Sequence, residues 1–284
     1  MGQSFYEADA DARAVFDEAS ELLGYDMKAL CFEENEKLNL TQYTQPAMVT
    51  TGIAIMKVVE KQGLLPDTAA GLSLGEYEAL YAAGALSVTD AIRVVARRGE
   101  LMEAAVPARV GAMAAVLGAE ASLIEETLSE IPEVWIANYN CPGQIVISGK
   151  KEAVEAAAEA LKARGIKRVL MLNVSGPFHS GLLREAGEEL GKVLAETEIH
   201  PLRIPYYANV TGGIVEDAAK VRGLLTEQVY SSVRFEQSIR NMLSAGVDTF
   251  YELGPGKTLA GFVKKIDREA TVVNIETMED LAKI

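Results

Sequence analysis

Residues 69–77 read Ala-Ala-Gly-Leu-Ser-Leu-Gly-Glu-Tyr and contain the pattern G-x-S-x-G between Gly71 and Gly75. A short apolar run precedes the pattern, and residues 76–83 have the composition of a helix. Glycines on both sides of Ser73 suit a sharp strand-to-helix turn, because side chains there would clash. Such a turn presents the serine hydroxyl as a nucleophile. The alternative is a glycine-rich turn that carries an ordinary serine.

Length and composition describe a globular protein with a sizeable core. The chain has 284 residues, of which 49% are hydrophobic and 24% charged, enough for one large domain or for a large and a small one. No apolar run approaches the ~20 residues that span a bilayer, and the N-terminus is acidic, so we expect no membrane association and a cytoplasmic location. Cys31 and Cys141 form no metal or disulfide pattern, so we expect no metal and two packing residues.

Charge and histidine content narrow the possible chemistry. The net charge of −14 argues against nucleic-acid binding, which needs a basic face. Any anionic partner must therefore dock on a locally basic patch. Only two histidines occur, His179 and His200, so the search for a general base that works near neutral pH is short.

Strands that alternate with helices on both sides of an insert predict an α/β fold with a mainly parallel sheet and a hydrolase-like core. Helical patterns cover residues 7–24, 46–62 and 88–105. Residues 110–173 have the order β-α-β-β-α-β, which predicts a ferredoxin-like subdomain. We expect residues 1–109 and 174–284 to form one discontinuous catalytic domain around it.

Six motifs occur in order along the chain and are together far more specific than the serine pattern alone. They are Thr41-Gln42-Tyr43-Thr44-Gln45-Pro46-Ala47, Gly71–Tyr77, Arg97-Arg98-Gly99, Asn138–Gln144, Gly176-Pro177-Phe178-His179 and Gly254-Pro255-Gly256-Lys257. With them the chain resembles, over nearly its whole length, the malonyl-CoA:acyl carrier protein transacylases. That family loads malonyl units for fatty-acid synthesis.

The resemblance implies a catalytic Ser73 with His179 as its base. A lone histidine is otherwise most often a packing or surface residue, and we interpret His200 as an ordinary loop residue. In this family a main-chain carbonyl orients the histidine, and the matching position is Gln228. An acceptor for Nδ1–H would leave Nε2 free to take the serine proton. The alternative for Gln228 is a position on a helix surface.

Arg98 follows Ser73 by the family's spacing for the arginine that binds the acyl carboxylate. A guanidinium offers two parallel N–H donors that match a malonyl carboxylate. A structural ion pair is the alternative for Arg98, and we expect Arg97 to be solvated or paired on the helix surface. Phe178 resembles the residue that restricts the pocket to unbranched malonyl, although it could simply pack under the loop.

Other family positions fall on amides and on basic residues. Gln45 and Asn140 are expected in loops that face the site, where they would orient acyl or oxyanion groups or would brace the loops. Lys167 and Arg168 match the region that faces the acidic carrier protein. A solvated face is the alternative for these two cations.

The chain departs from the family pattern in two places. Leu72 stands where the family usually has histidine, which should matter little because that residue is not the base. The family's first strand and its Gly-Gln-Gly-x-Gln loop precede the position that matches Met1, so we expect both to be missing here. That loop supplies one oxyanion N–H donor, and the other would be the N–H of Leu74. Loss of one such donor typically costs about 100–1000-fold in turnover.

The sequence therefore predicts malonyl transfer from coenzyme A to the phosphopantetheine thiol of acyl carrier protein through a malonyl-serine. We expect malonyl-CoA and acyl carrier protein as partners, no cofactor and a monomer. One alternative is a serine hydrolase or thioesterase on the same scaffold. Another is an impaired protein that binds the carrier without turnover.

Overall fold

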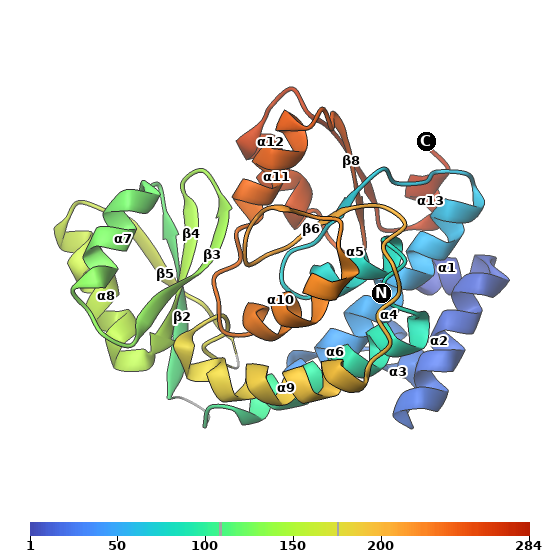
Figure 1. The fold of residues 1–284 in the computed structure, drawn as a ribbon, viewed down its shortest axis with the longest axis horizontal. Coiled ribbons are helices and arrows are strands. Elements are labelled where there is room, and N and C mark those ends of the chain that lie inside the picture. Colours follow the sequence, from blue (N-terminus) through green and yellow to red (C-terminus); the bar gives the residue numbers. More distant parts are fainter. Residues whose placement is uncertain (108–109, 175) are drawn as a thin grey trace.

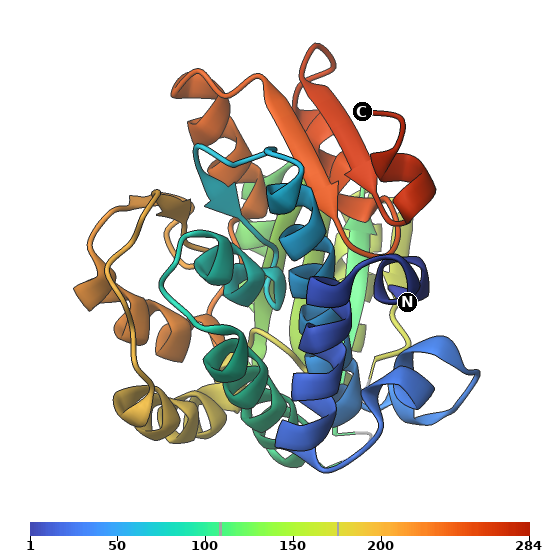
Figure 2. The ribbon, with the colours of Figure 1, turned by 90° about the vertical axis from the view of Figure 1, so that its right-hand side faces the viewer.

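The computed structural model describes residues 1–107, 110–174 and 176–284, which form a mixed α/β fold with two parts (Figure 1). A four-stranded sheet with two helices occupies one side of the molecule, and the helix-rich remainder occupies the other. Residue 109, the predicted end of the first large-domain segment, lies outside the described residues, as does residue 175. Seen from the side, the four-stranded sheet (green) stands behind the N-terminal helices (blue) (Figure 2).

The smaller part runs β2 (Gly111–Leu117), α7 (Ala121–Ser129), β3 (Val134–Cys141), β4 (Gln144–Lys150), α8 (Lys151–Ala163) and β5 (Arg168–Met171). Its sheet has the order β3-β4-β2-β5, and every pair is antiparallel. Successive side chains of β2 point to opposite faces of the sheet, and both faces are buried. Ala114 and Val116 join the core that includes α7 and α8, whereas Met113 joins the cluster that contacts Phe178.

The larger part is built around α4 (Thr41–Lys61), whose apolar side chains are buried nearly all round. The other helices are α1 (Gln3–Ala8), α2 (Ala10–Leu23), α3 (Met27–Phe32), α5 (Gly75–Ala82), α6 (Val88–Ala104), α9 (Arg184–Glu196), α10 (Val221–Gln228), α11 (Phe235–Ser244), α12 (Thr258–Ile266) and α13 (Met278–Leu281). Among the residues that the structure describes, no helix is both long and apolar enough to cross a membrane.

The strands of the larger part form two small sheets where a single, mainly parallel one is predicted. β1 (Ala69–Ala70) pairs in parallel with β6 (Tyr206–Tyr207), which pairs antiparallel with β7 (Ile214–Val215). β8 (Thr249–Leu253) and β9 (Thr271–Ile275) form a separate parallel pair. The prediction of one sheet is wrong for the described residues because side chains, and not backbone hydrogen bonds, connect the two sheets. Ala70 and Phe250 both pack on the cluster that contains Tyr207.

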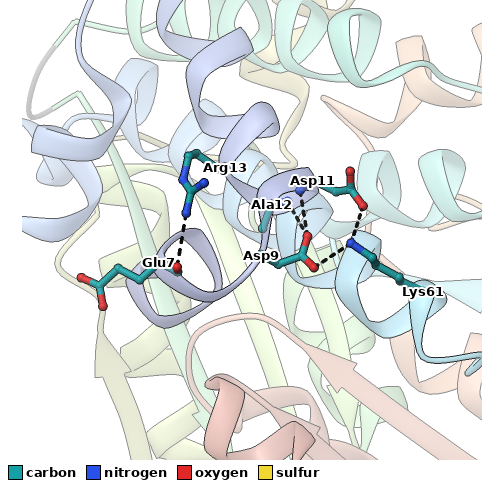
Figure 3. Close-up of polar contacts among 6 residues, drawn as sticks. All are labelled: Glu7, Asp9, Asp11, Ala12, Arg13 and Lys61. Carbon is teal, nitrogen blue, oxygen red and sulfur yellow. Dashed lines mark hydrogen bonds and ion pairs between the residues drawn. The ribbon is translucent and has the colours of Figure 1, made fainter.

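The helix expected over residues 7–24 is divided at Asp9 (Figure 3). The Asp9 carboxylate accepts the backbone N–H groups of Asp11 and Ala12, so it caps a new helix. The ammonium group of Lys61, at the end of α4, lies 2.9 Å from Asp9 and 3.0 Å from Asp11. This cap begins α2 and ties it to α4.

Two elements near the site are longer than expected. α4 begins at Thr41 and not at Pro46, because contacts with α6 hold the extra turn: the Gln42 N–H donates to Glu103 at 3.0 Å. For residues 134–148 the sequence predicts strands over 134–138 and 144–148 joined by a turn, but β3 continues through Cys141. Backbone hydrogen bonds between residues 137–139 and Val233 hold this end of the strand against the larger part.

Candidate active site

Ser73 lies in a tight turn between β1 and α5, with a φ of 53° in the left-handed region that serine rarely adopts. A Cβ atom at Gly71 would lie 2.0 Å from backbone atoms of Gly75, so glycine is required at position 71. A Cβ at Gly75 would meet nothing within 4 Å. The expected need for glycine is therefore correct at Gly71 and wrong at Gly75, because the Cβ direction at Gly75 is open.

The imidazole of His179 lies between the serine and a main-chain carbonyl. Its Nε2 is 2.7 Å from Ser73 Oγ, and its Nδ1 is 2.8 Å from the carbonyl oxygen of Gln228. A carbonyl only accepts, so Nδ1 carries the proton and Nε2 of the neutral ring is free to accept from the serine hydroxyl. This is the arrangement that a serine nucleophile needs.

Burial keeps the His179 ring neutral. The side chain is 3% exposed, and desolvation, together with the nearby charge of Arg98, lowers the pKa of His179 to about 4. Hydrogen bonds to the backbone of Gln228 and Ser231 oppose this shift. At neutral pH the ring therefore holds an empty acceptor toward Ser73. His200, in contrast, lies 3.5 Å from Glu198 with 42% of its side chain exposed.

Arg98 is buried beside the serine, with 1% of its surface exposed. Its Nη1 donates to Gln45 Oε1 at 2.8 Å, and its Nη2 donates to Ser73 Oγ and to Gln228 Oε1, each at 3.0 Å. Burial lowers the pKa of this guanidinium. No carboxylate of the described residues forms an ion pair with Arg98, and its Nε has no partner among them. Arg97 is on the surface and pairs with Glu100, as predicted.

Two buried residues that the sequence analysis did not single out complete the site. Asn209 accepts the N–H of Ser73 through Oδ1 and donates to the carbonyl of Gly71 through Nδ2, both at 2.6 Å. Glu76 accepts from Gln228 Nε2 at 2.7 Å, and burial raises the pKa of Glu76 to about 7. Glu76 lies next to the serine motif, so the sequence offered a means of predicting it as a site residue. Asn209 is distant from Ser73 in sequence, and no pattern in the sequence indicates it.

The remaining predicted residues lie around this group. Gln45 is on α4 and Asn140 on β3, so the expectation that both stand in loops is wrong. Both are buried, and the Asn140 side-chain oxygen has no partner among the described residues. Phe178 is partly buried between the two parts. Lys167 and Arg168 are exposed beside or on the edge strand β5.

Leu74 directly precedes α5. Its backbone N–H donates to no acceptor in the part of the chain that the structure describes. The N–H that directly follows the serine in the chain is therefore without a partner among the described residues.

A serine hydroxyl held between a neutral histidine and a buried arginine suits an acyl transferase. The chain belongs to the acyl transferase family, since residues 1–280 match the family model described as "Acyl transferase domain". It is 46% identical to the malonyl CoA-acyl carrier protein transacylase of Bacillus subtilis (strain 168), over 99% of this chain and 90% of that protein.

Solved structures of similar proteins also match this chain. An acyl carrier protein S-malonyltransferase from Vibrio cholerae O1 biovar eltor superimposes with a TM-score of 0.97 at 40% identity, covering 100% of this chain and 94% of the other. A second structure is a type II PKS acyl-carrier protein in complex with its malonyl-transacylase. It has a TM-score of 0.96 at 38% identity and covers 100% of this chain and 93% of the other.

Proposed function

We propose that this protein transfers a malonyl group from coenzyme A to the phosphopantetheine thiol of acyl carrier protein, through a malonyl ester on Ser73. One observation carries the proposal: Ser73 Oγ contacts both His179 Nε2 at 2.7 Å and Arg98 Nη2 at 3.0 Å. The first contact activates the serine, and the second places a cation where a malonyl chain on that serine ends. The named relatives and the family membership support the same reaction.

The first half-reaction forms the acyl-enzyme. Ser73 Oγ attacks the thioester carbonyl carbon while its proton passes to His179 Nε2, and the Gln228 carbonyl holds the charged ring through Nδ1–H. The C–S bond then breaks, and the coenzyme thiolate takes the proton from His179. In the second half-reaction the carrier's thiol gives its proton to His179 and attacks the ester, and Ser73 leaves with that proton.

Arg98 selects the acyl group. A malonyl chain carries a carboxylate three bonds beyond Oγ, and Arg98 meets only neutral oxygens in its hydrogen bonds. A carboxylate ligand would give this buried cation a direct anionic partner. Gln45 would hold the guanidinium from the side of Nη1. Phe178 and Asn140 would line the acyl site.

The oxyanion formed on the thioester carbonyl needs donors. The N–H of Leu74, at the start of α5, would supply one. The resemblance places a second donor in the Gly-Gln-Gly-x-Gln loop, whose position in the family precedes the one that matches Met1.

We infer that Ser73 stands on a nucleophile elbow, that residues 110–173 form a ferredoxin-like subdomain inserted into the catalytic domain, and that the enzyme is a cytoplasmic monomer without a cofactor. The carrier would approach the exposed cations Lys167 and Arg168.

Mass spectrometry after mixing with malonyl-CoA tests the function. We expect one malonyl adduct on Ser73, its loss in Ser73→Ala, and its transfer to added carrier protein. Free malonate released rapidly without an acceptor would indicate a hydrolase instead. Binding of the carrier without any adduct would indicate a non-catalytic carrier-binding protein.

A further inference from the structure

The side-chain amide of Gln228 connects the cation of Arg98 to the carboxylate of Glu76. Its Oε1 accepts from Arg98 Nη2 at 3.0 Å, and its Nε2 donates to Glu76 Oε2 at 2.7 Å and to the carbonyl of Ser73 at 2.8 Å. Glu76 and Gln228 have no exposed surface, and Arg98 is 1% exposed. The amide therefore lies between the Arg98 cation and the Glu76 carboxyl group, in a part of the site from which water is excluded.

These neighbours allow the amide only one orientation. A carboxylate accepts hydrogen bonds and a guanidinium donates them, whereas an amide has one accepting and one donating end. If the Gln228 amide were reversed, its NH₂ group would face the N–H groups of Arg98, and its oxygen would face the oxygens of Glu76. Both contacts would be repulsive, so the Glu76 carboxylate keeps the amide oxygen on Arg98.

We propose that Glu76 is a positioning residue for acyl-group selection: it acts through the Gln228 amide to hold the Arg98 guanidinium against Ser73. The proposal rests on the function assigned above, in which Arg98 binds the malonyl carboxylate. Glu76 forms no ion pair within 4 Å of Arg98 among the described residues, because the Gln228 amide lies between them. It thus fixes the cation without occupying the donors that a substrate needs.

Asn209 also contacts the Glu76 carboxylate, but its role in the site differs from that of Gln228. Its backbone N–H donates to Glu76 Oε2 at 3.3 Å, and its side chain holds the backbone of Gly71 and Ser73. Asn209 therefore acts on the serine turn, which every acyl group uses. Glu76 accepts from the Gln228 amide, which also donates to the Ser73 carbonyl. Through this amide Glu76 positions Arg98, which only a carboxylate-bearing acyl group uses.

The test is Glu76→Gln, with the rates of Ser73 acylation measured for malonyl-CoA and for acetyl-CoA. The new amide can donate as well as accept, so Gln228 is no longer confined to one orientation. We expect the preference for malonyl over acetyl, as the ratio of kcat/KM values, to fall about tenfold. Acetyl transfer should fall by a clearly smaller factor than malonyl transfer. Glu78→Gln is the matched control, because its carboxylate lies against Gly52 of α4 and makes no contact with Gln228.

A preference that stays within twofold in Glu76→Gln would overturn the proposal, as would an equal loss for both acyl groups. Gln228→Met provides a second route if Glu76→Gln does not fold. It keeps the backbone carbonyl that holds His179 and removes the amide, so the same loss of preference is expected, and an unchanged preference would overturn the proposal. The wild-type protein distinguishes failure of this proposal from failure of the proposed malonyl transfer. If wild-type Ser73 forms no malonyl adduct, the proposed malonyl transfer is itself wrong.

Discussion

Arg98 donates a hydrogen bond from Nη2 to Ser73 Oγ across 3.0 Å, so the residue that we propose to bind the acyl carboxylate touches the proposed nucleophile. The contact requires that a 17-residue helix, α6, deliver a charged side chain to the end of a strand-to-helix turn. Because the guanidinium is buried and meets neutral oxygens, a ligand carboxylate is the partner that would best stabilise it. Under the proposed function, acyl selectivity and catalysis would therefore depend on the same small set of atoms.

Arg98→Ala should abolish the preference for malonyl. We expect kcat/KM for malonyl-CoA to fall about 100-fold, the scale of a lost buried hydrogen-bonded ion pair, while acetyl-CoA is affected much less. Competition between the two thioesters for Ser73, read by mass spectrometry, measures this. Arg97→Ala is the matched control on the exposed neighbour. An equal loss for both thioesters would show that Arg98 is structural.

Acylation of Ser73 should be insensitive to pH across the range where free histidine titrates. Burial lowers the pKa of His179 to about 4, so its base form is complete at neutral pH and is lost only as the pH falls through about 4. Single-turnover acylation by malonyl-CoA, followed from pH 8 downward, should therefore remain flat to about pH 5. An inflection near pH 6.5 would mean that His179 is solvated in the free enzyme.

The two glycines of the serine motif should respond differently to alanine. Gly71→Ala would put a Cβ 2.0 Å from the backbone of Gly75, and we expect a loss of more than about 3 kcal/mol of stability or no folded protein. Gly75→Ala meets nothing within 4 Å, and a helical alanine should be neutral or mildly stabilising. Urea unfolding of both variants decides this. Similar losses at both positions would contradict the asymmetry of the turn.

The sequence predicted the parts of the site that depend on local pattern. The serine motif indicated Ser73, and the shortage of histidines together with the family resemblance indicated His179. Arg98 was predicted from the family's spacing, and the structure joins all three residues by hydrogen bonds. The Gln228 carbonyl was predicted only through the family resemblance. Its carbonyl accepts from His179 at 2.8 Å, so the alternative of a helix surface is wrong.

Interactions between distant segments were beyond local pattern. Asn209 is far from Ser73 in sequence, and only tertiary packing shows that it holds the Ser73 turn. The helical start at Thr41 likewise depends on contacts with α6, which override the preference of Pro46 for a first turn. The division of the expected sheet has the same origin, since side-chain packing between β1 and β8 leaves no pattern in either strand.

Glu78 should make the protein less stable as the pH rises from 7 to 8. Burial raises the pKa of this partly buried carboxyl to about 8, above the ordinary value of 4.5, so the folded protein holds a proton that the unfolded chain releases. Between those two values the free energy of unfolding therefore falls as the pH rises, by less than about 1.4 kcal/mol per pH unit for this group. His179 contributes little in this interval, because its folded and unfolded pKa values both lie below it.

Glu78→Gln removes the titration, so urea unfolding at pH 7 and pH 8 should show a smaller loss of stability than in the wild type. An equal loss in both proteins would mean that Glu78 is charged and solvated in the folded state.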